Sequence, residues 1–239
     1  MKIILAALDE ELVEAWVKHC GNLKCVQVHA GSIFDVSCDA VVSPANSFGF
    51  MDGGIDLLYS QHFGWHVQDR LQKLIHEHHH GELLVGSAEI VETRDDDIPF
   101  LIAAPTMRVP TILRRSVAPY LAARAAILLV RHGEFKSGPH KNSRISEKVT
   151  CLALPGLGTG VGQVSPDLCG RQVRAAIEDA TGSPRIHTTW QEAQERHQLL
   201  FTDRVGDLQS EDPFGSRDKI LKQMRGRFLG HYRRGKTRR

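Results

Sequence analysis

The stretch of the sequence that decides the fold reads Val41-Val-Ser-Pro-Ala-Asn-Ser-Phe-Gly-Phe-Met-Asp-Gly-Gly-Ile-Asp56. Its paired valines are typical of a strand that is covered on both faces. The glycines that follow indicate a loop, and from residue 55 to residue 79 apolar side chains recur at helical spacing. We therefore predict a strand, a glycine-rich loop and one long helix, which together form the repeating unit of an α/β fold.

A second stretch of the same kind reads Pro155-Gly-Leu-Gly-Thr-Gly-Val-Gly162. It follows a predicted strand and precedes a helix that Ser165 is predicted to cap. Backbone N–H groups in such a loop can turn toward one point and hold a phosphate. The spacing matches neither a P-loop, because no Lys-Ser/Thr pair follows, nor the G-x-G-x-x-G dinucleotide motif. A crossover loop without a ligand explains the spacing equally well.

The two loops are expected to face one ligand, because the carboxyl ends of parallel strands meet at the same edge of a sheet. In the first loop, the amide of Asn46 can donate to and accept from a ribose hydroxyl. Asp56 falls in the first turn of the predicted helix, where the helix dipole favours the ionised carboxylate. Such a carboxylate can orient a hydroxyl or a water, although a helix-capping acid explains the position as well.

The rest of the chain continues the alternation of strands and helices. Strands are predicted over 2–7, 24–29, 39–43, 84–92, 100–104 and 149–154, and further helices over 9–20, 116–134, 165–180 and 189–200. This pattern favours an α/β fold with a mixed or mostly parallel sheet. We expect one domain over residues 1–205 and a basic C-terminal extension over residues 206–239.

Charge and cysteine content narrow the function classes. The 239 residues include 30 Lys and Arg against 28 Asp and Glu, which excludes a surface that is basic throughout. Ten of these basic residues and one acidic residue fall between 215 and 239, so this tail carries about +9 and the rest about −7. The five cysteines form no C-x-x-C pair and indicate reduced thiols. With an apolar N-terminal run too short for export, we expect a cytoplasmic protein.

Five motifs, taken in order, resemble the macrodomain family, whose members bind ADP-ribose and in some branches hydrolyse it from proteins or nucleic acids. They are Gly31-Ser-Ile33, Asp39-Ala-Val-Val-Ser-Pro-Ala-Asn-Ser47, Met51-Asp-Gly-Gly-Ile-Asp56, Leu101-Ile-Ala-Ala-Pro105 and Gly158-Thr-Gly-Val-Gly162. The ordered set is more specific than any one motif. The resemblance implies a three-layer α-β-α macrodomain with a central mixed, mostly parallel sheet of about six strands.

The resemblance also implies which residues surround the ligand. Ser32 and Ile33 would lie at the adenine, and the distal ribose would be surrounded by Ala45, Asn46, Gly53, Gly54 and Ile55. The diphosphate would lie against Gly158, Thr159, Gly160 and Val161, with Gly162 beside them. In hydrolytic members the residues that match Asn46 and Asp56 hold the distal ribose and assist water attack at its anomeric carbon, so these two are the candidate catalytic residues.

The sequence departs from the family pattern at four of these places. Ser32 stands where many members have an aspartate that binds the adenine, and Ser43 where the usual residue is asparagine. Asp52 replaces the first of three glycines, and its carboxylate would either repel the diphosphate or turn to the ribose. Gly162 stands where many relatives have an aromatic ring against the distal ribose. The ring of Phe48, Phe50 or Trp65 could take the place of that missing ring.

Three functions remain open from the sequence. The first is an ADP-ribosylhydrolase, and the second is a module that binds ADP-ribose, or a macromolecule carrying it, without turnover. The third is a factor that binds RNA, DNA or another polyanion through the arginines and aromatic rings of residues 225–239. We expect no cofactor and no metal, since the histidines from His76 to His80 are explained as favourable charges at a helix C-terminus.

Overall fold

The computed structural model describes residues 1–44, 46–184, 186 and 189–203. The chain divides into two compact units, residues 1–188 and 189–239. In the second unit α6 (Trp190–Gln198) begins with a capping box, in which Thr189 and Glu192 bond each other's backbone N–H. The predicted basic extension and Ala45 lie outside the described residues, and the predicted domain boundary at residue 205 stays a prediction. None of the described helices is long and apolar enough to cross a membrane.

The first unit alternates strands and helices along most of its length. Its elements are β1 (Lys2–Ala7), α1 (Glu10–Cys20), β2 (Val26–Ala30), β3 (Ala40–Ser43), α2 (Gly54–Phe63), α3 (His66–His79), β4 (Glu89–Glu92), β5 (Phe100–Ala103), α4 (Ala118–His132), β6 (Cys151–Leu154) and α5 (Pro166–Thr181). The strands form one sheet in the order β2-β1-β6-β3-β5-β4. The described pairs are parallel except β4 with β5, which confirms the predicted mixed, mostly parallel sheet.

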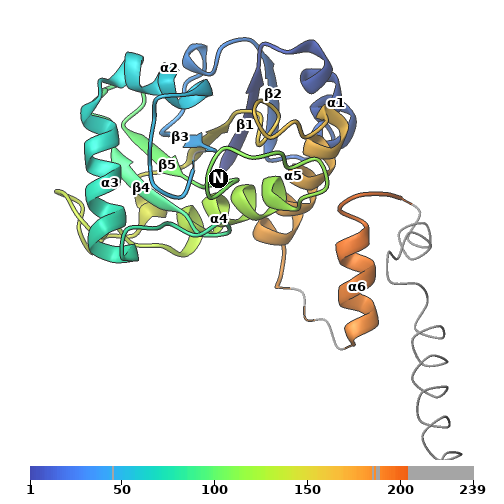
Figure 1. Cartoon of the computed structure of the whole chain (residues 1–239). Helices are drawn as coiled ribbons and strands as arrows, with labels where there is room; N and C mark the ends of the chain where they lie inside the picture. The colour runs from blue at the N-terminus through green and yellow to red at the C-terminus, as the bar shows by residue number, and fades with distance from the viewer. Residues whose placement is uncertain (45, 185, 187–188, 204–239) are drawn as a thin grey trace, which may run out of the picture. The chain divides into compact units, whose positions relative to one another are not determined.

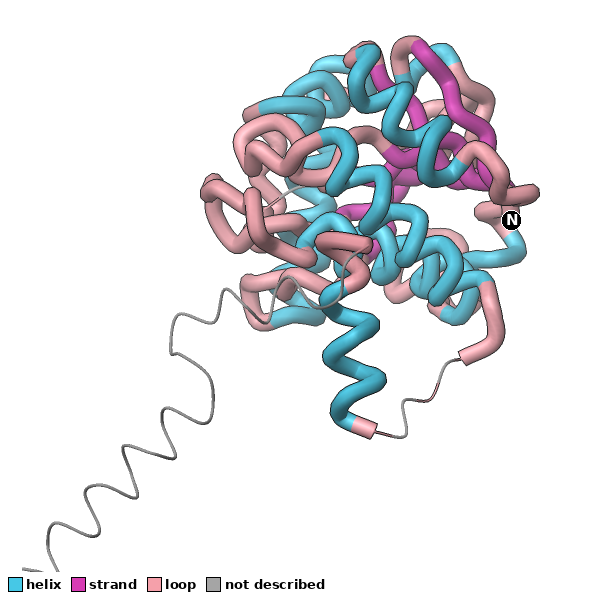
Figure 2. Tube along the Cα trace, turned by 90° about the vertical axis from the view of Figure 1, so that its right-hand side faces the viewer, coloured by secondary structure: helices cyan, strands magenta, loops and turns pink. Residues whose placement is uncertain are grey.

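Both faces of the sheet are buried, because alternate residues of each strand point to opposite sides. On β3, Val41 packs in the apolar cluster that contains the buried side chains of α2 and α3, whereas Val42 packs in the cluster of α1, α4 and α5. Figure 1 shows the sheet between these two groups of helices, and Figure 2 shows the strands among the helices from the perpendicular direction. The three-layer architecture expected from the resemblance is confirmed.

The prediction of a single helix from residue 55 to residue 79 is wrong. The chain forms two helices, α2 and α3, because Gly64 adopts a φ of 92° that cannot continue an α-helix. Its N–H bonds the carbonyl of Ser60 and closes α2. The apolar spacing did not reveal this break, since Phe63 and Val67 on its two sides are both buried in the same cluster.

The predicted N-cap of α1 is confirmed. Asp9 caps the helix by accepting from the N–H of Leu12 at 2.8 Å, as its residue type and position predict. The cap turns the chain directly after β1, so the carboxyl end of β1 and the first turn of α1 lie at the same edge of the sheet. The parallel strands β3, β5 and β6 end at that edge as well.

Candidate functional site

A cavity of about 460 Å³ opens at the carboxyl edge of the sheet. Four parallel strands contribute to it at or shortly after their last residues, through Ala7 at the end of β1, Pro44 after β3, Thr106 three residues after β5 and Pro155 after β6. This volume lies in the range of small-molecule sites, and the edge is where open α/β folds bind ligands.

The two glycine-rich loops line this one cavity. The structure brings together these residues of the predicted site: Asn46, Asp52, Gly53, Gly54, Ile55, Asp56, Gly158, Thr159, Gly160, Val161 and Gly162. They come from segments more than a hundred positions apart in the sequence. Whether they bind a ligand stays a prediction, but the convergence of the two loops is a property of the fold.

In the loop between β6 and α5, carbonyl groups are hydrogen-bonded within the protein. The carbonyls of Gly158, Gly160 and Gly162 accept from Val164, Gln163 and Leu113, at 3.0, 2.9 and 2.7 Å. By contrast, the backbone N–H groups of residues 159 to 162 find no acceptor within the described part of the chain. Successive N–H groups without a protein acceptor form an anion-binding concavity, so this loop can hold a phosphate through its backbone alone.

Close packing of the same loop explains one departure from the family pattern. A Cβ atom at Gly162 would lie 2.5 Å from the carbonyl oxygen of Gly158 and 3.0 Å from a methyl group of Leu113. Gly158 itself has a φ of 70°, which favours glycine. The turn therefore has no room for the aromatic ring that many relatives carry at the position of Gly162.

The loop between β3 and α2 is held by the side chain of Asn46. Its Oδ1 accepts from the N–H groups of Phe48 and Phe50 at 3.1 and 3.2 Å, and its Nδ2 donates to the carbonyl of Phe50 at 2.8 Å. Asn46 therefore fixes the shape of its own loop, a role that the sequence analysis missed. Its predicted contact with a ribose stays a prediction, to be made by the second hydrogen of Nδ2.

Two residues of the neighbouring helices complete this loop. Gln68 on α3 accepts from the N–H of Met51 at 2.8 Å, and Ser60 on α2 donates to the carbonyl of Met51 at 2.8 Å. Met51 is fully buried, so these bonds satisfy backbone groups that water does not reach. Next to it, Phe50 lines the cavity with its side chain half exposed. No pattern in the sequence identifies Gln68 as part of this arrangement.

Asp56 is the buried carboxyl group of the cavity. It lies in the first turn of α2, is 7% exposed, and accepts from the hydroxyl of Ser43 at 2.5 Å. Burial raises the pKa of Asp56 to about 7, against the opposing effect of the Ser43 hydrogen bond. Burial therefore opposes the effect expected from the helix dipole on this group. A carboxyl group with this pKa can both take up and release a proton at neutral pH.

The charges around the cavity are negative. Asp9 and the exposed Asp52 line it together with Asp56, and no lysine or arginine is found among its lining residues in the described chain. An anionic ligand would therefore depend on the backbone N–H groups of residues 159 to 162 and on the first N–H groups of α2, which the start of a helix leaves unpaired.

Three predicted site residues are not among those that line the cavity. Ser32 accepts from the N–H of Phe34 at 3.2 Å and caps a short 3₁₀ helix, and Ile33, the first residue of that helix, is buried. Their segment begins next to the cavity, since Gly31 donates to the carbonyl of Ala7 at 2.9 Å. Ala45 lies outside the described residues.

Several lining residues were not predicted. Leu8 and Asp9 follow β1, while Thr106, Met107 and Pro110 follow β5. Their position directly after parallel strands was the signal that could have identified them. Leu8, at 80%, and Val161, at 62%, are among the most exposed large apolar side chains of the described chain, so the cavity has an apolar rim on both sides.

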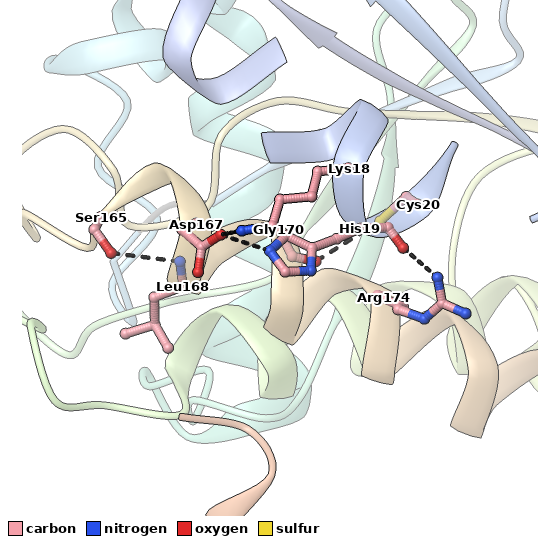
Figure 3. Close-up of polar contacts among 8 residues, drawn as sticks. All are labelled: Lys18, His19, Cys20, Ser165, Asp167, Leu168, Gly170 and Arg174. Carbon is pink, nitrogen blue, oxygen red and sulfur yellow. Dashed lines mark hydrogen bonds and ion pairs between the residues drawn. The ribbon is translucent and has the colours of Figure 1, made fainter. Parts of the chain in front are cut away.

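The end of α1 and the first half of α5 are joined by polar contacts (Figure 3). Asp167 in the first turn of α5 contacts Lys18 Nζ at 2.6 Å and His19 Nε2 at 2.8 Å. These two partners lower the pKa of Asp167. Further along α5, Arg174 donates to the carbonyl of His19. The contacts fix the start of α5 and therefore the end of the glycine-rich loop that precedes it.

The histidine-rich end of α3 has a structural partner. His79 Nε2 lies 2.7 Å from Glu89 Oε1 on β4. Within the described residues no group of three or more His, Cys, Asp or Glu side chains is arranged to hold a metal ion.

Comparison with known proteins gives three kinds of match. The family model of the macro domain matches residues 42–173. An uncharacterized protein of Aquifex aeolicus is 30% identical over 147 residues, which cover 61% of this chain and 76% of that protein. Two solved structures of an Oceanobacillus iheyensis macrodomain, a glycine-to-valine mutant with ADPR and a form with ADP, share the fold.

These two structures superpose on this chain at TM-scores of 0.51 and 0.50, and their sequences are 15% and 16% identical to it. Each match covers 71% of this chain, and 86% and 84% of the respective structure.

Proposed function

Because the chain belongs to the macro domain family, we propose that the cavity at the carboxyl edge of the sheet binds ADP-ribose. One observation carries the proposal: two glycine-rich loops from distant parts of the sequence line one cavity, and one of them offers a row of N–H groups that find no acceptor among the described residues. A pyrophosphate needs such donors where no basic side chain is present. The similar macrodomain structures with ADPR and with ADP support the same ligand class.

In this proposal the pyrophosphate lies against residues 159 to 162 and the start of α2. The distal ribose lies beside Asp52 and Asp56, and the adenosine extends toward Leu8 and Asp9 at the end of β1. Asn46 contributes by holding the loop that carries Phe50 over the ligand. The polar groups then orient the ligand, while the apolar rim covers its sugar and base.

A charge placed at the rim tests ligand binding. Val161 is exposed and lines the cavity, so Val161→Glu changes no buried contact and puts a carboxylate beside the pyrophosphate. The matched control is Leu58→Glu, which adds the same charge at an exposed position of α2 outside the cavity lining. By calorimetry, Val161→Glu should weaken ADP-ribose binding at least tenfold, or about 1.4 kcal/mol, and Leu58→Glu less than twofold. Absence of saturable binding to the wild type, or equal losses in both variants, would refute the proposal.

We further propose hydrolysis of mono-ADP-ribose linkages in the same cavity, with Asp56 as the general base. The specific observation is the pKa of Asp56, which burial raises to about 7 and which suits proton transfer at neutral pH. In the fraction of complexes in which Asp56 is ionised, water would attack the anomeric carbon of the distal ribose and lose a proton to that carboxylate. The bond to the modified group would break, and that group would leave with a proton from solvent.

Release of ADP-ribose from mono-ADP-ribosylated proteins tests this step. The wild type should release it at least a hundredfold faster than the isosteric variant Asp56→Asn, in line with the usual contribution of a general base. The double variant Asn46→Ala, Asp56→Ala sets the background rate. Binding of ADP-ribose without release above that background would leave a module that binds ADP-ribose without turnover.

A further inference from the structure

Ser43 and Asp56 form a buried pair that the family pattern does not contain. Ser43 is the last residue of β3 and is fully buried, and its hydroxyl donates to Asp56 Oδ1 at 2.5 Å. Asp56 is fixed by the first turn of α2. Since a strand and a helix hold the two partners, the pair has one defined geometry, and Asp56 lines the cavity while Ser43 lies buried behind it.

We propose that Ser43 is a positioning residue which holds Asp56 as a proton acceptor, so that binding of a pyrophosphate ligand in the cavity takes up one proton from solvent. This inference rests on the proposed binding of ADP-ribose. It goes beyond that function by adding a linkage between ligand binding and pH, and by assigning the linkage to a serine that touches Asp56.

The geometry leaves one oxygen of Asp56 available for the proton. Ser43 occupies Oδ1, and no donor from the described residues reaches Oδ2. A pyrophosphate brings negative charge into a cavity that has no lysine or arginine in its described lining. A like charge disfavours the ionised carboxylate, so the proton is taken up on Asp56 as the ligand enters. Because the pKa of Asp56 in the free protein is about 7, this uptake falls in the neutral range.

The other ionisable groups near Asp56 do not replace it as the proton acceptor. Tyr59 on α2 is fully buried, donates to the carbonyl of Val42 at 3.1 Å, and has its pKa raised first by burial and then by Asp56. It therefore stays neutral. Asp9, the N-cap residue of α1, accepts from the N–H of Leu12, and Asp52 on the β3–α2 loop is exposed to water. Neither is among the groups that shift the pKa of Asp56, which are burial and the Ser43 hydrogen bond.

The sign of the pH dependence follows from this arrangement. Below the pKa of the free protein, Asp56 is already protonated, and the ligand meets no added charge. As the pH rises above that value, each binding event must protonate Asp56, and affinity falls by up to tenfold per pH unit. The fall ends at the higher pKa of the bound state.

Ser43 sets the pH at which affinity for the ligand begins to fall. Its hydroxyl donates to the carboxylate and so lowers the pKa of Asp56 from the value that burial alone would give. In Ser43→Ala, Asp56 should hold its proton to higher pH, and uptake on binding should move upward with it. A serine with only a structural role would leave unchanged the pKa of Asp56 and the pH at which binding takes up a proton.

The first experiment needs no ligand. The carboxyl carbon of Asp56 is followed by NMR through a pH titration of the full chain, in the wild type, in Ser43→Ala and in Ser60→Ala. Ser60 is the matched control, since it is also buried but donates to the carbonyl of Met51. We expect Ser43→Ala to raise the midpoint by about one pH unit and Ser60→Ala to leave it in place. Equal midpoints in the wild type and Ser43→Ala would overturn the role of Ser43.

The second experiment is calorimetry with ADP-ribose near neutral pH, in buffers of different ionisation enthalpy. The wild type should take up a substantial fraction of one proton, Ser43→Ala should take up less, and Asp56→Asn none. Binding without proton uptake in the wild type would overturn the linkage and leave the proposed binding intact. Absence of binding in every buffer would refute the proposed function and the linkage together, while the NMR titration would still decide whether Ser43 controls Asp56.

Discussion

The two glycine-rich loops line the same cavity, but they are held in different ways. Side chains hold the β3–α2 loop: the Asn46 amide bonds the backbone of Phe48 and Phe50, and Gln68 bonds Met51. The β6–α5 loop is held through its own backbone, where Gly162 packs against the carbonyl of Gly158. One loop therefore presents side chains to the cavity, and the other presents bare N–H groups.

This difference shows that glycine serves two purposes in one site. In the β6–α5 loop it permits close backbone packing, and any added Cβ at Gly162 meets the chain itself. In the β3–α2 loop a Cβ at Gly53 meets no atom within 4 Å, so that position is open space. Loss of the Asn46 or Gln68 side chain should therefore loosen the β3–α2 loop, whereas a side chain added at Gly162 should strain the β6–α5 loop.

The largest effect is expected at Asp56, the buried carboxyl group that follows the β3–α2 loop. The pKa of Asp56 is raised from 3.8 to about 7, so its contribution to stability is fully present below pH 4 and is lost as the pH rises to 7. In Asp56→Asn the free energy of unfolding, relative to the wild type, should increase by about 1.4 kcal/mol per pH unit over that interval. Urea unfolding at several pH values measures it. A difference that does not change with pH would contradict the burial of an ionisable group at this position.

The next effect separates the glycines of the β6–α5 loop. Gly162→Ala forces the carbonyl of Gly158 to move and should lower the free energy of unfolding by about 2–3 kcal/mol, as overpacking does. Gly160→Ala is the control, since its Cβ meets no atom within 4 Å, and its effect should stay within about 0.5 kcal/mol. Thermal or urea unfolding compares the two. Equal stability of both variants would mean that the loop is not held by its own backbone.

A substitution outside the loops tests how the β3–α2 loop is held. Gln68→Met keeps the size of the side chain on α3 but leaves the buried N–H of Met51 without an acceptor. An unsatisfied buried donor costs about 1–3 kcal/mol, and we expect about 2 kcal/mol in urea unfolding, with weaker ADP-ribose binding. The control is Gln191→Met, on the exposed side of α6 in the second unit. Wild-type stability of Gln68→Met would show that this bond does not hold the loop.

The smallest effect on stability is expected at Asn46. Asn46→Ala removes three bonds that are partly open to water and should lower stability by about 1 kcal/mol, while weakening ADP-ribose binding more strongly through the loosened loop. Asn46→Asp keeps the acceptor for Phe48 and Phe50 and loses only the bond from Nδ2. Because Asn46→Asp also adds a negative charge beside an anionic ligand, the two variants are compared by urea unfolding, and equal losses of stability would contradict a role of Oδ1 in holding the loop.

The sequence was sufficient for what depends on local chemistry and on motif order. The alternation of strands and helices, the Asp9 cap and the convergence of the two loops follow from residue type and from the geometry of parallel sheets. The bonds of Asn46 depend on how one loop folds back on itself, and Gln68 reaches Met51 from another helix. The pKa of Asp56 depends on burial, which the dipole argument from its sequence position does not contain. The break at Gly64 was hidden by apolar residues on both sides.

Two loops that hold one pyrophosphate ligand should respond to that ligand together. Titration of nitrogen-15-labelled protein with ADP-ribose, followed through the backbone amide signals, measures the two loops at once. We predict that the signals of Thr159, Gly160 and Val161 shift together with those of Gly54 and Ile55, with one dissociation constant. Shifts confined to one loop, different dissociation constants for the two loops, or no shifts at all would contradict the claim.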